Sequence, residues 1–327
     1  MNIAFTICSN NYLAHAKTVG DSFLQFHPEF KFVIGLVDEV DNSIDYSQFS
    51  TFEIILLKDL KLSNLDLLVQ KFNITELNTS VKPSFFKYFF EVLNASSVIY
   101  IDPDILVLSR FTEVVEMLKL TNIIITPHIL TPVDDDFAPT DYHTLRGGVF
   151  NLGFLALSNY SKVKVFLDWW DARVIKYGFA DFTKNMFYDQ IWINYVPAFY
   201  DNYSILKHPG YNMSNWNLHE RHLTFSDGNF VVNNNHPLRF FHFSSYDHTK
   251  PSIICAYQTR YNFDNRKDLT ELFEKYQKLL LKNDIERIKK LRLFYFQKTA
   301  NDKKNIRSLL KKIVRDLVRR IKTSLPL

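Results

Sequence analysis

The sequence has few cysteines and few residues that interrupt regular structure. Its 327 residues include two cysteines, eight glycines and 11 prolines. Cys8 and Cys255 are too few for a disulfide-stapled fold and form no CxxC zinc motif, which suits a reducing cytoplasm. Hydrophobic residues make up 46% and charged residues 23% of the chain, so disorder and collagen-like repeats are excluded. We therefore expect a folded globular protein.

Long apolar runs are also absent. The longest internal stretch without a charged residue, 147–161, contains Asn, Ser and Gly and is shorter than the roughly 20 apolar residues that cross a bilayer. The apolar run 3–8 is too short for the core of a signal peptide and has no basic residues before it. We expect this run to be a buried strand and the protein to lie in the cytoplasm.

Positive charge is concentrated at the C-terminal end. Residues 301–327 hold nine basic and two acidic residues, whereas the first 300 hold 30 basic and 33 acidic ones. The net charge of +4 therefore gives no reason to expect a nucleic-acid partner. Apolar residues four apart, with Lys and Arg on the remaining arc, predict a helix on an anionic membrane surface. The alternative is that this helix packs on the main domain or on a second subunit, and the latter would make the protein an oligomer. The apolar positions are Leu309, Ile313, Leu317 and Ile321.

The order of elements indicates an α/β fold. Short β-branched runs alternate with helical stretches, as in βαβ units with a mostly parallel sheet. We expect a domain over 1–262 and a helical, basic extension over 263–327, with short strands and loops over 200–243. The strands are expected at 3–8, 32–37, 52–57, 97–101, 123–126 and after Gly147, and the helices at 13–26, 83–93 and 163–177.

Two carboxylates stand at the end of one expected strand. Asp102 and Asp104 flank Pro103 directly after the run 97–101. A turn at this proline can direct both side chains toward one hard cation. Charges at the end of a buried strand are costly unless they are compensated, and a divalent ion with a diphosphate would compensate them. Turn or capping aspartates are the plainer interpretation of an isolated Asp-x-Asp pair.

Four short motifs follow one another along the chain. They are Ser-Asn-Asn-Tyr at 9–12, Asp-Pro-Asp at 102–104, Phe-Asn-Leu-Gly at 150–153 and Asp-Gln at 189–190. With these motifs in this order, the chain resembles a glycosyltransferase of the GT-A fold, most closely the family 8 type of bacterial surface-glycan synthesis. A fifth, at 242–251, is similar to the family's late His-x-x-Gly-x-x-Lys-Pro element. The resemblance covers residues 1 to about 260 and implies a mixed sheet flanked by helices.

The resemblance also implies a cation site. Asp102 and Asp104 would bind Mn²⁺ or Mg²⁺ with His242 as the third ligand, and an imidazole nitrogen favours Mn²⁺. A buried histidine among phenylalanines is the alternative for His242. Lys250 would lie near the diphosphate, or else be a solvated loop lysine. In this element Ser245 replaces the usual glycine, and the Lys-Pro pair comes two residues late.

Further residues are implied as contacts of a UDP-sugar. Asn11 and Tyr12 match the loop that contacts the uridine, unless Tyr12 merely starts a helix, and Ser9 stands where relatives often have Asp. A basic residue before the metal motif would reach the donor. Lys87 is the better positional match and Lys82 the second. Asn151 would bind a hydroxyl of the sugar, or else stabilise a turn.

Asp189 and Gln190 match the pair beside the transferred sugar. Asp189 would orient hydroxyls and Gln190 would face the anomeric carbon. Because an amide is a poor nucleophile, the resemblance favours a front-face reaction with retention. A capping aspartate is the alternative for Asp189. Three consecutive aspartates at 134–136 are expected in a solvated loop.

The sequence thus predicts a metal-dependent transferase that moves a hexose, galactose or glucose, from a UDP-sugar onto a surface glycan or lipid-linked acceptor. The protein would act at the cytoplasmic face of the membrane, held there peripherally by its tail. A scaffold that binds sugar nucleotides without turnover is one alternative. An aspartate-based phosphotransferase is another, although its motif normally opens the sheet domain.

Overall fold

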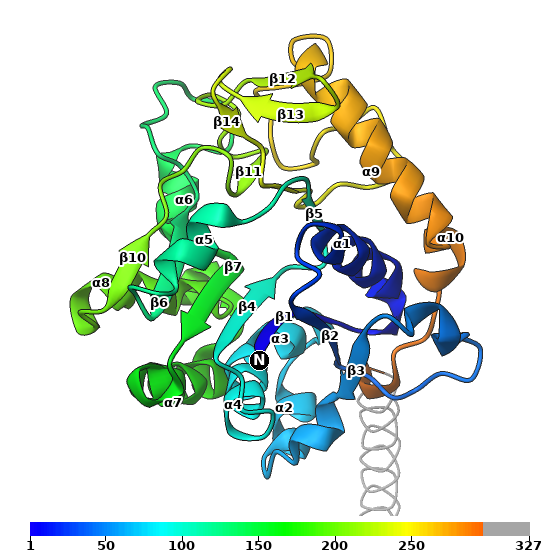
Figure 1. Ribbon diagram of the computed structural model, residues 1–327, viewed down its shortest axis with the longest axis vertical. Coiled ribbons are helices and arrows are strands. Elements are labelled where there is room, and N and C mark those ends of the chain that lie inside the picture. The colour runs from blue at the N-terminus through cyan, green and yellow to red at the C-terminus, as the bar shows by residue number, and fades with distance from the viewer. Residues whose placement is uncertain (297–327) are drawn as a thin grey trace, which may run out of the picture.

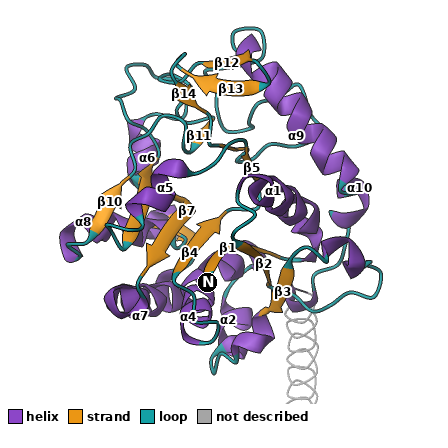
Figure 2. Ribbon diagram, viewed as in Figure 1, coloured by secondary structure: helices purple, strands orange, loops and turns teal. Residues whose placement is uncertain are grey.

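The computed structural model describes residues 1–296. Its centre is a seven-stranded mixed sheet in the order β10-β6-β7-β4-β1-β2-β3, flanked by helices on both faces (Figures 1 and 2). The expected α/β class is therefore confirmed. The strands of this sheet are β1 (Asn2–Cys8), β2 (Lys31–Leu36), β3 (Glu53–Leu56), β4 (Ser97–Ile101), β6 (Ile123–Pro127), β7 (Phe150–Ser158) and β10 (Tyr203–Ile205).

The helices follow the expected positions closely. The helix predicted over 13–26 has these bounds, and the ones predicted at 83–93 and 163–177 begin slightly earlier. The longer helices are α1 (Leu13–Phe26), α4 (Lys82–Glu91), α7 (Tyr160–Tyr177) and α9 (Thr270–Lys282). The shorter ones are α2 (Leu65–Lys71), α3 (Ile74–Ser80), α5 (Thr112–Met117), α6 (Asp141–Gly147), α8 (Val196–Phe199) and α10 (Ile285–Ile288).

One strand departs from the mostly parallel sheet that the sequence predicts. β1, β2, β3 and β4 pair in parallel, as do β6 and β10, but β7 runs antiparallel to both of its neighbours, β4 and β6. The reversed strand follows the short helix α6, which ends at Gly147 and Gly148. Gly148 has a φ of 119°, a conformation that L side chains rarely adopt.

Alternating side chains divide the core into two layers. On β1, Ala4 faces the layer that contains α1, whereas Phe5 faces the layer that contains α4 and α7. Four phenylalanines of α4 are buried in this second layer, and Pro83 lies in the first turn of the helix, where no backbone donor is lost. The four are Phe85, Phe86, Phe89 and Phe90.

A smaller sheet at the carboxyl end of β4 brings distant segments together. β5 (Ile105–Val107) pairs antiparallel with β15 (Phe240–His242), which also pairs with β11 (Met213–Ser214). As expected, residues 200–243 otherwise form short strands and loops. These strands are β12 (Leu223–Ser226), β13 (Asn229–Val232) and β14 (His236–Pro237), and a separate hairpin is made by β8 (Ala180–Asp181) and β9 (Met186–Phe187).

The C-terminal part of the described chain packs on the α1 layer. Leu272, Phe273 and Tyr276 of α9 and Ile285 of α10 are buried in the same core as α1. Figure 1 shows α9 and α10 along the edge of the molecule beside α1. The proposed division at residue 262 stays a prediction, and the basic helix at 301–327 lies outside the described residues. Within residues 1–296, no helix has the length and apolar character to span a membrane.

Candidate functional site

Asp102 and Asp104 lie in the tight connection between β4 and β5. The backbone N–H of Ile105 donates to the Asp102 carbonyl at 3.2 Å, and the N–H of Asp102 donates to the Gly153 carbonyl on β7 at 2.8 Å. Both aspartate side chains are about a quarter exposed, 25% and 24%. The turn at Pro103 therefore presents two accessible carboxylates at the carboxyl edge of the central sheet.

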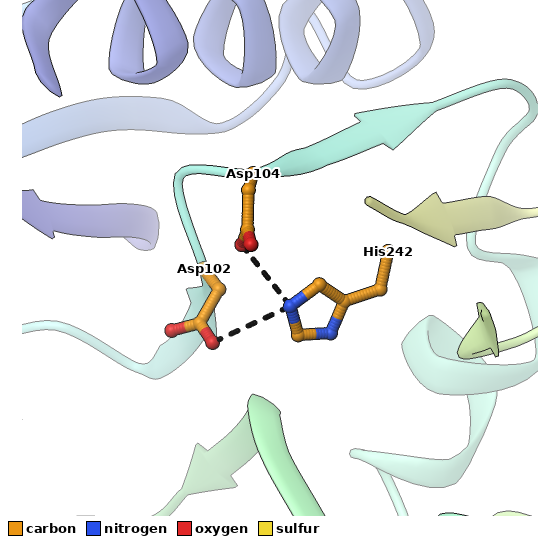
Figure 3. A group of neighbouring side chains, drawn as sticks. All are labelled: Asp102, Asp104 and His242. Atoms are coloured by element: carbon orange, nitrogen blue, oxygen red, sulfur yellow. Dashed lines mark ion pairs between the residues drawn. The ribbon is translucent and has the colours of Figure 1, made fainter. Parts of the chain in front are cut away.

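His242 reaches these carboxylates through strand pairing. His242 pairs with Ile105 in the β15–β5 ladder, and the N–H of Phe243 donates to the Asp104 carbonyl at 2.8 Å. The imidazole Nε2 lies 3.0 Å from Oδ1 of Asp104 and 3.7 Å from Oδ2 of Asp102. Figure 3 shows the ring directed at both carboxylates. A residue about 140 positions away in the chain thus completes the group.

The charges of this group stabilise each other. Burial acts against the charged form of His242, but the carboxylates of Asp104 and Asp102 outweigh it and raise the pKa of the imidazole. Burial likewise tends to raise the pKa of Asp104, but the charge and hydrogen bond of His242 outweigh it, and this pKa is lowered. The imidazole therefore compensates the negative charge of the two aspartates.

The donor set fits a divalent ion. One ligand atom from each of Asp102, Asp104 and His242 lies within 4.8 Å of the others. Two carboxylate oxygens and an imidazole nitrogen suit Mn²⁺ well, and Mg²⁺ less well because of the nitrogen. The Nδ1 atom of His242 is buried without a hydrogen-bond partner in the described structure.

Lys82 links the metal motif to Asp189. Its ammonium lies 3.0 Å from Oδ2 of Asp189 and 3.7 Å from Oδ1 of Asp102, and it donates to the Leu152 carbonyl at 3.1 Å. The side chains of Lys82 and Asp189 are only 4% and 2% exposed. Burial lowers the pKa of Lys82, but the charges of Asp189 and Asp102 outweigh it and the net shift is upward. Burial raises the pKa of Asp189 despite the opposing charge of Lys82.

Lys87 does not join this group. Its ammonium pairs with Asp171 at 2.9 Å and with Asp168 at 3.2 Å, both on α7. The structure therefore corrects the prediction that ranked Lys87 ahead of Lys82. Of these two lysines of α4, only Lys82 lies beside Asp102. Residues five apart on a helix point in different directions, so only Lys82, at the start of α4, faces the end of β4.

Gln190 and Asn151 are buried near Asp189, and their side chains hydrogen-bond to backbone groups. The Gln190 amide donates to the Gly147 carbonyl at 2.8 Å and accepts from the N–H of Leu152 at 2.9 Å.

Asn151 accepts from the N–H of Gly153 at 3.2 Å, and its amide nitrogen lies 3.1 Å from Nε2 of His128. The Asp189 side chain makes no capping hydrogen bond to the 3-10 helix Gln190–Tyr195.

The expected uridine loop forms a 3-10 helix, Asn10–Tyr12, between β1 and α1. Tyr12 is 44% exposed, and its ring stacks on His15 with centroids 4.4 Å apart. Desolvation and the charges of Asp104 and Asp102 raise the pKa of Tyr12 to about 12. Ser9 is buried, donates to the Val37 carbonyl at 3.2 Å and accepts from an amide at 3.0 Å. Asn11 is partly exposed.

Lys250 and the three consecutive aspartates lie in exposed loops. Lys250 is exposed, and its N–H donates to the Asp247 carbonyl in a turn. Asp134, Asp135 and Asp136 are exposed as expected, and Asp135 pairs with Arg260 at 2.7 Å. None of these contacts joins Lys250 to the group around Asp102.

Sequence reasoning missed one residue of the site, Tyr100. Its hydroxyl donates to Oδ1 of Asp102 at 2.5 Å, and its ring lies under the Lys82 ammonium, 4.4 Å from the centroid. The signal was present, because residues i and i+2 of a strand share a face. A tyrosine two positions before Asp102 therefore points to the same side as the carboxylate.

Comparison with known proteins gives distant similarities. No protein-family model matches the sequence. A protein of Bacillus subtilis strain 168, described as the uncharacterized protein YfnF, is 27% identical over 134 residues. This match covers 41% of the chain and 43% of the relative, so it spans less than half of either protein.

The chain is also similar to solved structures of glycosyltransferases. The galactosyltransferase LgtC, solved with donor and acceptor analogs, gives a TM-score of 0.49 at 15% identity over 86% of this chain and 96% of that one. The glycosyltransferase GlyE of Streptococcus pneumoniae TIGR4 gives 0.47 at 17% identity over 89% and 65%. Mouse xyloside xylosyltransferase 1 gives 0.41 at 12% identity over 75% and 98%. Scores below 0.5 define no close structural relationship.

Proposed function

We propose that this protein is a metal-dependent glycosyltransferase of the GT-A fold and family 8 type, which takes a hexose from a UDP-sugar. The observation that carries the proposal is the convergence of Asp102, Asp104 and His242, whose ligand atoms lie within 4.8 Å of one another. This group shares Asp102 with the buried Lys82–Asp189 pair. A cation site and a polar pocket for a sugar would thus be adjacent. The motif resemblance supplies galactose or glucose as the donor sugar.

Asp102, Asp104 and His242 would hold Mn²⁺ or Mg²⁺, and the ion would neutralise charge on the departing diphosphate. In this structure, Nε2 of His242 faces the carboxylates of both aspartates. A cation would replace that contact, and the carboxylates, already preorganised, would not have to reorient.

Asp189 and Lys82 would face the transferred sugar. The ammonium of Lys82 balances the buried Asp189 carboxylate, so Asp189 can accept hydrogen bonds from sugar hydroxyls without an uncompensated charge. Gln190 uses both ends of its amide on backbone groups. An amide bound in this way would shape the pocket and would not act as a nucleophile, which supports a front-face reaction with retention.

The proposed base-binding loop follows β1, which lies parallel to β4, so it stands at the same edge of the sheet as Asp102. Tyr12 offers an exposed ring that could stack on uracil, and Asn11 offers a polar side chain. Asn151 would contact the sugar from β7. For the diphosphate, Lys250 remains a proposal that requires its loop to move, because the structure places this residue in an exposed turn.

The acceptor and the place of action are further proposals. A surface glycan or a lipid-linked saccharide would suit an enzyme that sits peripherally on the cytoplasmic face of a membrane. The basic sequence at 301–327 motivates this proposal. Deletion of these residues should release the protein from anionic vesicles, and undiminished binding would reject a membrane role for the tail.

Calorimetric titration with UDP tests the proposed function. We expect UDP to bind in the presence of Mn²⁺ and to bind at least tenfold more weakly when EDTA removes the metal. Asp104→Asn should reproduce the EDTA result in a folded protein, because it removes the negative charge of one ligand and keeps the shape of the side chain. Asp136→Asn, in the exposed loop, is the matched control and should bind like the wild type. Equal UDP affinity with and without Mn²⁺ would contradict the proposal.

A further inference from the structure

The two oxygens of Asp102 have different surroundings. Oδ1 accepts the hydroxyl of Tyr100 at 2.5 Å and lies 3.7 Å from the ammonium of Lys82. Oδ2 faces Nε2 of His242 at 3.7 Å. Figure 3 shows one oxygen turned to the imidazole and the other turned away from it. Only Oδ2 is therefore directed at the space that the three ligand atoms share.

The position of the Tyr100 hydroxyl is fixed by its surroundings. Tyr100 lies on β4 and is only 2% exposed. Its ring packs edge-on against Phe5, with centroids 5.0 Å apart, and the Lys82 ammonium lies over its face. A ring held by contacts on its edge and its face cannot swing the hydroxyl away from Asp102 without disturbing the core.

We propose that Tyr100 is a positioning residue that binds Oδ1 of Asp102 to the protein and leaves Oδ2 as the single oxygen offered to a divalent cation. The inference rests on the proposed metal site. A carboxylate with one oxygen in a short hydrogen bond keeps its plane fixed and binds a metal through the other oxygen. Loss of such an outer contact typically lowers metal affinity by about 10 to 100-fold.

The test is the variant Tyr100→Phe, which removes the hydroxyl and keeps the ring. Binding of Mn²⁺ in the presence of saturating UDP is measured by electron paramagnetic resonance. We expect the variant to bind Mn²⁺ about tenfold more weakly than the wild type. Tyr211→Phe is the matched control, because Tyr211 is equally buried and donates to Glu113 at 2.9 Å. Its Mn²⁺ affinity should equal that of the wild type.

A double-mutant cycle separates positioning from a general loss of stability. If Tyr100 acts through Asp102, Tyr100→Phe should cost no further Mn²⁺ affinity in the Asp102→Asn background. An equal loss in both backgrounds would overturn the proposal, as would wild-type affinity in Tyr100→Phe. Failure of the wild type itself to bind Mn²⁺ would instead reject the metal site, and the positioning role with it.

A crystal structure of the wild type with Mn²⁺ and UDP tests the same point if Tyr100→Phe does not fold. We expect Asp102 to coordinate Mn²⁺ through Oδ2 only, while its Oδ1 still accepts the hydrogen bond of the Tyr100 hydroxyl. Bidentate coordination by Asp102, or rupture of the Tyr100 hydrogen bond, would overturn the proposal while leaving the proposed function in place.

Discussion

Charge compensation at single residues explains how the site tolerates so many buried ionisable groups. Lys82 balances Asp189, and His242 balances Asp104, each at 3.0 Å. The sequence identified Asp102 and Asp104 from local chemistry, because a carboxylate pair at the end of an apolar run is unusual. It ranked Lys87 ahead of Lys82, because the choice depends on α7, which packs against α4 and supplies Asp168 and Asp171.

A pair of lysine variants tests this difference. Lys82→Met should lower the free energy of unfolding by about 3 to 5 kcal/mol, because it leaves the buried Asp189 carboxylate without its partner. Lys87→Met should cost about 0 to 1 kcal/mol, since its ion pairs are partly exposed. Denaturant unfolding of both variants at neutral pH measures the difference. Equal losses would show that the Lys82–Asp189 pair is not a buried, mutually dependent contact.

The lowered pKa of His27, a residue away from the site, predicts that the stability of the protein depends on pH. Burial and the nearby charge of Arg110 lower the pKa of His27 to about 4, while its Nε2 accepts from the N–H of Phe111 at 2.9 Å. In the unfolded chain the pKa is about 6.5. Between these values the unfolded state binds the proton and the folded state does not. The free energy of unfolding should therefore fall as the pH drops from about 6.5 to about 4, by up to ~1.4 kcal/mol per pH unit.

His27→Gln is the variant that checks this contribution, because glutamine can still accept from the N–H of Phe111 and does not titrate. Unfolding by urea at pH 7 and pH 5 should show a smaller loss of stability on acidification in the variant than in the wild type. An unchanged loss would mean that His27 does not contribute. His15 and His128 also have pKa values lowered to about 4, chiefly by burial, so some acid sensitivity should remain.

Helices and strands were predicted well where the signal in the sequence was local. The expected strands and the helices α1, α4 and α7 followed from periodicity, turn residues and the position of Pro83. The reversed direction of β7 was not predictable, because strand direction depends on the path of the chain through the connection 128–149. The β5–β15 pairing joins residues about 140 positions apart, and only the motif resemblance suggested that His242 would meet the aspartates.

β7 approaches the site so closely that glycine is required at position 153. A Cβ atom on Gly153 would lie 2.5 Å from Cε1 of His242 and 2.9 Å from Oδ1 of Asn151. Gly153→Ala should therefore displace the imidazole and lower Mn²⁺ affinity at least tenfold. Gly228→Ala, where a Cβ would meet no atom within 4 Å, serves as the control for Mn²⁺ affinity, because the strain of its φ of 78° falls on an exposed turn between β12 and β13. Unchanged Mn²⁺ binding in Gly153→Ala would show that His242 is not held against β7.

The C-terminal part of the described chain contacts the same carboxylate as the proposed nucleotide loop. The carboxylate of Asp38 accepts from the N–H of Asn10 at 3.3 Å and from the N–H of Phe294 at 2.8 Å. α10 packs against the same 3-10 helix, Asn10–Tyr12. The sequence suggested a helical extension after residue 262 but not that its first helices would share the core of α1. Such contacts depend on surfaces that form only when the chain has folded.

The release of UDP from UDP-galactose and UDP-glucose, measured with Mn²⁺ and with EDTA, tests whether the protein is a metal-dependent transferase. We expect release from at least one donor that requires Mn²⁺ and is lost in Asp104→Asn. Release that persists in EDTA, or no release from either donor by a folded protein that contains Mn²⁺, would contradict the proposed function.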